Sequence, residues 1–202
     1  MTGHMRYEEL DQETRRWMLE EFGAEEAGEP YRSPSLSAKG REAFGEMMRE
    51  AITSGTEESL AAALKPKELW AEYEPSPLGG IRKTEPARAA VALARSEFNT
   101  WYIRGLCRRL MEEGETYLQI YRAADADAPG DQCVPYQNMV LEIRHVYNGH
   151  RAKYWPVKND RVFSVPCGPP CRHTVRRISS SMKAMIELEA REFGAAFRRP
   201  GP

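Results

Sequence analysis

The sequence predicts an α+β protein dominated by helices, with a long central helix, a small antiparallel β region and a C-terminal helix. Two observations lead to this prediction. Apolar residues recur at three- and four-residue steps through 86–113 and again through 176–199. Between these stretches lie short segments that alternate or are rich in β-branched and aromatic residues.

The composition narrows the class of protein. Lysine and arginine number 29 against 30 aspartate and glutamate residues, so the formal net charge is −1. A protein that coats nucleic acid needs a basic surplus, which this chain lacks. The chain has no long apolar run and no signal-peptide pattern at its start, so we expect no membrane contact. Its four cysteines predict a reducing compartment rather than a disulfide framework.

The first part of the chain predicts an appendage. Residues 6–22 are strongly charged and are typical of a short amphipathic helix, and the Gly-, Pro- and Ser-rich residues 23–37 predict a linker. We therefore expect a charged helix and linker at 1–36, followed by a single α+β domain at 37–202.

Two further helices are expected before the central one. The first, about 37–53, begins at the potential N-cap Ser37. The second, 57–64, follows Thr56, whose position before two glutamates is typical of a helix start. Residues 73–83 are rich in proline and glycine and predict a loop.

The central helix is the clearest element. Thr84 is a potential N-cap, Pro86 suits the first turn, and Gly114 is a plausible residue just after the last turn. The core-facing stripe is predicted to comprise Val91, Ala94, Phe98, Trp101, Tyr102, Leu106 and Leu110.

Three polar residues, Glu97, Asn99 and Arg104, lie within this apolar helix. Polar groups in such a position usually form buried hydrogen bonds or face a partner, and we expect the same here.

The β region is expected to contain three strands, at 116–123, 138–147 and 161–166. A closing helix is predicted at 176–199.

A cluster of cysteine and histidine residues suggests a zinc site. Cys167, Cys171 and His173 have the residue types and spacing of zinc ligands, and Cys133 is the natural fourth ligand. An equally good interpretation makes Cys167 a small core residue and places Cys171 and His173 at the start of the next element. A catalytic Cys–His pair is the least favoured interpretation, because no orienting acid accompanies it.

Two groups of residues are candidates for contact with a partner or with nucleic acid. Arg172, Arg176 and Arg177, with Arg198 and Arg199 further on, would form a basic face, although solvated, charge-balanced arginines are the favoured explanation. The segment 147–156 combines aromatic and basic residues and resembles a base-stacking platform, or else a loop that plugs the β region. Its candidate contact residues are His150, Arg151, Tyr154 and Trp155.

Several of these stretches occur in a familiar order. The helix contains "ARSEFNTWYIRGLCRRLMEEG", followed by "YLQIYRAAD", "DQC", "NMVLEI" and "PCGPPCRHTVRRI". This order resembles the C-terminal domain of the phage head morphogenesis, or minor head, proteins, the Mu F-like family. The resemblance covers about 85–178. Tyr136 stands where the family has a second cysteine, and His173 replaces the final one.

The resemblance implies a noncatalytic role inside the head of a tailed phage or prophage, close to the portal, in assembly or in DNA packaging and delivery. The expected partners are the portal and major capsid proteins, with packaged DNA as a further candidate. The protein would be found in the virion, or in the host cytoplasm during assembly. The alternative is a small zinc-dependent enzyme or binding module for nucleic acid, based on the Cys/His ligands and on 147–156.

Overall fold

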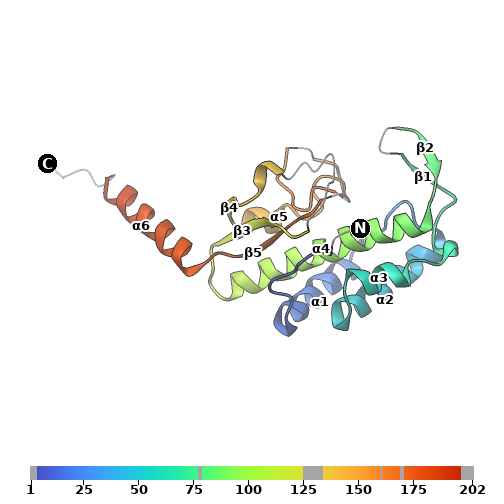
Figure 1. Cartoon of the computed structure of the whole chain (residues 1–202), viewed down its shortest axis with the longest axis horizontal. Helices are drawn as coiled ribbons and strands as arrows, with labels where there is room; N and C mark the ends of the chain where they lie inside the picture. Colours follow the sequence, from blue (N-terminus) through green and yellow to red (C-terminus); the bar gives the residue numbers. More distant parts are fainter. Residues whose placement is uncertain (1–3, 77–78, 125–133, 160, 169–170, 197–202) are drawn as a thin grey trace.

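Helix α4, Pro86–Glu112, runs through the middle of the molecule (Figure 1). The computed structural model describes residues 4–76, 79–124, 134–159, 161–168 and 171–196. On one side of α4 lie α1 (Gln12–Glu26), α2 (Ala38–Ser54) and α3 (Glu57–Ala63). On the other side lie α5 (Ile143–Asn148) and a sheet of β3 (Tyr117–Arg122), β4 (Val140–Glu142) and β5 (His173–Arg177). This arrangement confirms the predicted α+β class.

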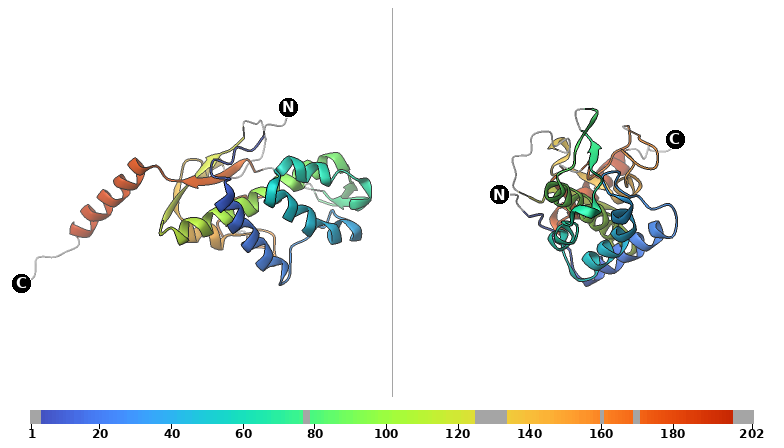
Figure 2. Two further views of the ribbon diagram at one scale, coloured as in Figure 1. Left: turned by 90° about the horizontal axis from the view of Figure 1, so that it is seen from below. Right: turned by 90° about the vertical axis from the view of Figure 1, so that its right-hand side faces the viewer.

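Two elements extend from this body at opposite ends (Figures 1 and 2). The strands β1 (Tyr73–Pro75) and β2 (Ile81–Lys83) form a hairpin at one end. Helix α6 (Ser180–Ala196) leaves the body at the other end. Short 3₁₀ turns occur at Lys67–Leu69 and Val134–Tyr136. None of the helices in the described part of the chain is long and apolar enough to cross a bilayer.

Helix α4 is buried on most of its circumference because helices cover one side and the sheet covers the other. The predicted stripe is confirmed at Ala94, Phe98, Trp101, Tyr102, Leu106 and Leu110, each of which is at most 1 % exposed. Polar side chains on the other faces of the helix are buried as well, among them Glu97, Asn99 and Thr100. Each of these therefore needs a partner inside the protein.

Helix α1 begins at Gln12, later than predicted, because the Asp11 side chain accepts a hydrogen bond from the Thr14 amide and caps the helix there. Its Met18 packs against α4 at Gly105, where an added Cβ would lie 2.7 Å from the Met18 nitrogen. The helix shares one hydrophobic core with α2, α3 and α4. Among the described residues, the expected boundary at residue 36 therefore does not separate two cores.

The N-terminal strap, residues 5–11, crosses from α3 to the sheet. The Arg6 amide donates to the Ala123 carbonyl at 2.8 Å, and the Arg177 amide donates to the Glu9 carboxylate at 2.6 Å. Helical structure is absent from residues 6–10 because their hydrogen bonds are made to α4 and the sheet instead.

The sheet has the order β4-β3-β5 and is antiparallel throughout. The strand predicted at 116–123 is confirmed as β3. The strand predicted at 138–147 is wrong beyond Glu142, because Ile143 and Val146 take a helical spacing and are buried as part of α5. Residues 161–166, predicted as the third strand, do not form a strand. The third strand of the sheet is β5.

The helix predicted from residue 176 begins only at Ser180. Arg176 and Arg177 belong to β5, where Arg177 pairs with Leu118 and Arg176 with Gln119. The remaining helix starts were predicted well: Ser37 and Thr56 cap α2 and α3, and Gly114 has a positive φ after α4. Thr84 is not the cap of α4, because Glu85 holds that position.

Candidate functional site

Among the residues that the structure describes, the most deeply buried ion pair links α4 to the segment after α5. The guanidinium of Arg151 binds both carboxylate oxygens of Glu97, with N–O distances of 2.9 and 2.6 Å. The two side chains are 1 % and 2 % exposed. Glu97 therefore has the buried partner that its place in an apolar helix predicted.

Helix α1 contributes a second carboxylate to this cluster. Glu25 accepts hydrogen bonds from Arg151 Nε at 3.2 Å and shares a 3.0 Å contact with His150 Nε2. We call Glu25, Glu97, His150 and Arg151 the buried charge cluster. It joins the end of α1, the middle of α4 and the turn after α5, three segments that are far apart in the sequence.

Burial and neighbouring charges set the ionisation of the cluster. Burial lowers the pKa of His150 to about 4, with the cations of Arg151 and Arg104 acting in the same direction and Glu25 opposing them. The ring is neutral at pH 7, and contact with a carboxylate then requires the proton on Nε2. Burial tends to lower the pKa of Arg151, but the Glu97 and Glu25 carboxylates outweigh it and hold that pKa well above its ordinary value.

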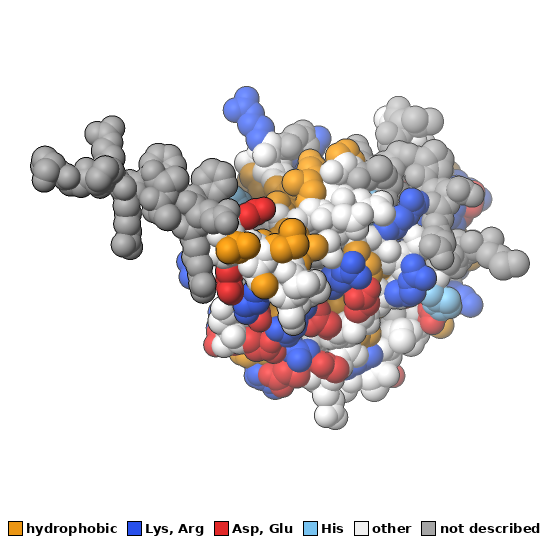
Figure 3. Space-filling view, turned by 60° about the vertical axis from the view of Figure 1, so that its left-hand side comes forward, with side chains coloured by type: hydrophobic (Ala, Val, Ile, Leu, Met, Phe, Trp, Pro, Cys, Tyr) orange, Lys and Arg blue, Asp and Glu red, His pale blue; other side chains and the backbone are white. Residues whose placement is uncertain are grey.

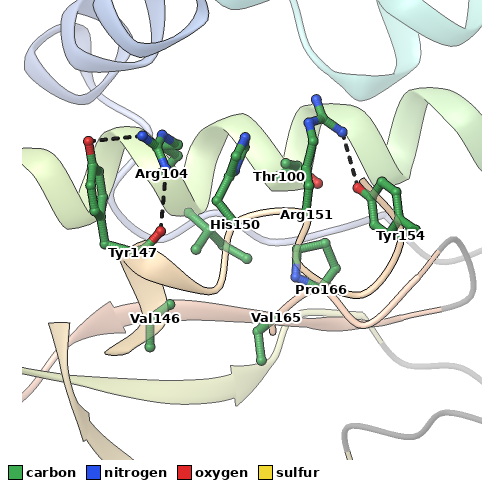
Figure 4. Close-up of a pocket in the computed structure, with 10 residues that line it drawn as sticks. Thr100, Arg104, Val146, Tyr147, His150, Arg151, Tyr154, Val165 and Pro166 are labelled. Carbon is green, nitrogen blue, oxygen red and sulfur yellow. Dashed lines mark hydrogen bonds between the residues drawn. The ribbon is translucent and has the colours of Figure 1, made fainter. Parts of the chain in front are cut away.

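Aromatic rings enclose the Arg151 guanidinium. It lies 4.7 Å from the ring centroid of Tyr31 and 5.3 Å from that of Trp101, within the range of cation–π attraction. The Tyr154 hydroxyl contacts it at 3.1 Å (Figure 4). The backbone φ of Arg151 is 53°, a left-handed conformation that is uncommon outside glycine. The surrounding contacts stabilise a turn that the residue itself disfavours.

Arg104 occupies a neighbouring cluster on the same side of α4. It donates to Glu21 of α1 at 2.6 Å and to the Tyr147 hydroxyl of α5 at 3.0 Å. The small hollow between the two clusters, drawn in Figure 4, has a cavity volume of about 10 Å³. That volume suits roughly one water molecule, so the hollow is too small for an organic substrate.

Asn99 fastens α4 to the sheet. Its amide Nδ2 donates to the backbone carbonyl of His173, the first residue of β5, at 2.9 Å. The three polar residues predicted to have buried partners in α4 therefore all have them, and each binds a different segment.

The predicted zinc ligands lie at the start of β5. Cys171 is 2 % exposed and His173 is fully buried, and the His173 amide contacts Cys171 Sγ at 3.5 Å. Cys167 is half-buried and packs against the core. Cys133 lies outside the described residues. Within the described part of the chain, no three His, Cys, Asp or Glu side chains are grouped as metal ligands.

The predicted basic face is made of side chains that bind acids. Arg176 donates to Gln119 and to Glu8, and Arg177 binds three glutamates. Acidic and basic side chains are interspersed over the lower half of the space-filling view (Figure 3). Arg172 is half-buried, and its carbonyl accepts the Ala123 amide.

The segment 147–156 does not present the surface platform that its composition suggested. Arg151 and His150 face the buried charge cluster, and Tyr154 packs edge-on against Tyr31 at 5.3 Å. Trp155 is half-buried. The alternative interpretation of this segment, a plug, is closer to its geometry, although it covers α4 and α1 in addition to the β region.

Sequence reasoning missed the glutamates that complete these clusters. Glu21 and Glu25 are among many acids in a charged helix, and nothing local distinguishes them from solvated residues. The useful signal was Gly149, where an added Cβ would lie 2.1 Å from the Phe163 carbonyl oxygen. In the sequence, a glycine at this position predicts a turn, but it does not indicate that His150 and Arg151 point inward.

Comparisons of the chain with protein-family models, with curated proteins and with solved structures found no match. The geometry is therefore the only guide beyond the resemblance. The buried charge cluster is built to hold segments together, because its Arg151 and Glu97 are satisfied by each other and enclosed by aromatic rings.

Proposed function

We propose that the chain is a noncatalytic component of the head of a tailed phage or prophage, acting near the portal in head assembly or DNA packaging and delivery. The proposal starts from the resemblance of residues 85–178 to the minor head proteins. Its expected partners are the portal and major capsid proteins, with packaged DNA as a further candidate.

One contact carries the structural support. The resemblance rests on several short motifs, of which one includes Glu97 and Asn99 and another includes Cys171 and His173. The Asn99 side chain binds the His173 carbonyl at 2.9 Å, across 74 residues of sequence. A contact between residues of two motifs supports the proposal, because it gives the motifs a common structural role in fastening the central helix to the last strand.

The test is association in co-expression. The tagged chain would be expressed with a portal protein from its own genome, and separately with the major capsid protein of that genome. We expect a complex that survives size-exclusion chromatography, together with the chain in purified virions by mass spectrometry. The portal protein of an unrelated phage is the matched control. Failure to associate with either partner, with the chain absent from virions, overturns the proposal.

Zinc binding by Cys171 and His173, at the start of β5, is a separate proposal. A thiolate and an imidazole are suitable zinc donors, and Cys171 and His173 supply them two residues apart. Bound zinc would link the start of β5 to Cys133, which lies outside the described residues. Elemental analysis of the purified protein should find zinc, retained in Cys107→Ser and lost in Cys171→Ser. Absence of zinc from wild-type protein that was expressed in zinc-supplemented medium would contradict this proposal.

A further inference from the structure

Exposed apolar side chains lie at both ends of the molecule, and the charged residues beside them have opposite signs at the two ends. Met185 and Leu188 of α6 are 62 % and 57 % exposed, and Tyr73 and Ile81 of the β1–β2 hairpin are 54 % and 76 % exposed. Large apolar side chains exposed to this extent, and gathered on one element, are typical of interaction sites.

On the hairpin, the register places the exposed residues on one face. Tyr73 pairs with Lys83 and Pro75 with Ile81, whereas the intervening pair, Glu74 with Arg82, points to the other face. Glu74 is buried and forms an ion pair with Arg82 at 2.7 Å. The outer face is therefore apolar, with Lys83 as its charged residue. We call Tyr73, Pro75, Ile81 and Lys83 the hairpin face.

On α6, Met185 and Leu188 are three residues apart and share a side of the helix. The exposed carboxylate of Glu189, four residues after Met185, lies on the same side of the helix. The helix is held at its start, because Ser179 Oγ accepts the Met182 amide at 3.2 Å and Lys183 binds Glu115 at 2.8 Å. We call Met185, Leu188 and Glu189 the tail face.

A molecule cannot join its own two faces, because the hairpin and α6 lie at opposite ends of its long axis (Figures 1 and 2). The faces complement each other, since one offers apolar side chains with Lys83 and the other offers apolar side chains with Glu189. Pairing of two α6 helices about Leu188 would instead bring the Glu189 carboxylates of both copies close together, and like charges repel.

We propose that the tail face of one molecule binds the hairpin face of a second copy, so that copies associate head to tail. Such a contact is heterologous: each added copy leaves one hairpin and one tail face open, which generates a ring or an open chain. This inference concerns self-association and does not depend on the proposed role in the phage head.

The test uses two variants, each lacking one face. The hairpin variant carries Tyr73→Asp and Ile81→Asp, and the tail variant carries Met185→Asp and Leu188→Asp. All four positions are exposed, so both variants should retain the circular dichroism spectrum of the wild type. Val157→Asp, at another exposed apolar residue, is the matched control.

Sedimentation velocity over a concentration series should show the wild type and the Val157→Asp control growing beyond the 23.0 kDa monomer mass. Each double variant alone should remain monomeric. An equimolar mixture of the two should form a dimer and nothing larger, because only one tail face and one hairpin face remain intact.

Three results would overturn the proposal. The first is a wild type that stays monomeric at every concentration. The second is self-association of the hairpin variant alone, which would indicate pairing between two α6 helices. The third is self-association of the tail variant alone, which would indicate pairing between two hairpins. Charge reversal at Lys83→Glu should weaken association several-fold, and a Glu189→Lys partner should restore it.

Discussion

Arg151 and Arg177 both bind several carboxylates, but the Arg151 side chain is 1 % exposed and the Arg177 side chain 33 % exposed. Arg151 meets Glu97 and Glu25 inside a shell of aromatic rings. Arg177 meets Glu9, Glu113 and Glu115 at the surface where the N-terminal strap crosses β5.

The same chemistry has different consequences in the two places. Removing one partner of a buried ion pair leaves an uncompensated charge away from water, which costs about 3–5 kcal/mol. Water and salt screen the exposed pairs, which typically contribute about 0–1 kcal/mol. We therefore expect substitutions in the buried charge cluster to lower the free energy of unfolding much more than substitutions in the Arg177 cluster, which comprises Arg177, Glu9, Glu113 and Glu115.

The largest effect is expected for Glu97→Ala. Arg151 would remain buried with Glu25 as its nearest carboxylate, and the free energy of unfolding should fall by about 3–5 kcal/mol. Urea denaturation followed by circular dichroism measures this change. Glu187→Ala, at an exposed position on α6, is the control and should change stability by less than about 0.5 kcal/mol. A loss below about 1 kcal/mol for Glu97→Ala would contradict the comparison.

The next effect concerns acid. The folded-state pKa of His150 is about 4, against an ordinary value of 6.5, so the unfolded chain binds this proton more readily. The contribution of His150 to the free energy of unfolding is therefore fully present above pH 6.5. It is lost as the pH falls to about 4, and the total loss is roughly 3 kcal/mol. Unfolding free energies at pH 7.5, 5.5 and 4.5 measure it.

His150→Gln is the control for this titration, because glutamine can donate to Glu25 without titrating. Its stability should fall less steeply over the same pH range. Burial tends to raise the pKa of Glu25, but contacts with His150 and Arg151 lower it below its ordinary value. The protein therefore also loses the stabilising contribution of the Glu25 carboxylate on acidification. Equal slopes for wild type and His150→Gln would show that another group is responsible.

A double-mutant cycle measures the coupling energy between the two partners of an ion pair directly. Glu97→Leu combined with Arg151→Met should be less destabilising than the sum of the two single changes, with a coupling energy of about 2 kcal/mol or more. The corresponding cycle for Arg177→Ala and Glu113→Ala should give about 1 kcal/mol or less. Similar coupling energies in the two cycles would mean that burial does not distinguish the clusters.

The smallest effect is expected for Arg177→Ala alone. Its exposed pairs should contribute about 1 kcal/mol or less, and 0.5 M salt should reduce that difference. Unfolding free energies of wild type and variant at low and high salt measure it. A loss as large as that of Glu97→Ala, unaffected by salt, would reverse the ranking of the two clusters.

Local signals in the sequence were enough for the helical body. Caps at Ser37 and Thr56, the apolar stripe of α4 and the need for partners at Glu97, Asn99 and Arg104 were all predicted correctly. These features depend on residues close together in the chain. The resemblance to the minor head proteins also came from the sequence, and it stays a prediction.

The errors arose where distant contacts decide the outcome. Residues 143–148 are compatible with both strand and helix periods, and packing of Ile143 and Val146 selects the helix. Arg151 was read as a surface residue, because its partner Glu25 is 126 residues away. The strand β5 was missed since its arginines suit either a strand or the start of a helix.

The N-terminal strap also affects the order in which the chain can fold during synthesis. Residues 5–11 are made before every element that they contact. Their contacts with α3, α4 and β3 can form once Ala123 has been made, whereas their contacts with β5 exist only after Arg177 has been made. The strap therefore takes its final place in two stages, and the second stage depends on β5. Nascent chains stalled after Arg172 should accordingly be cleaved by protease within the strap faster than the completed protein.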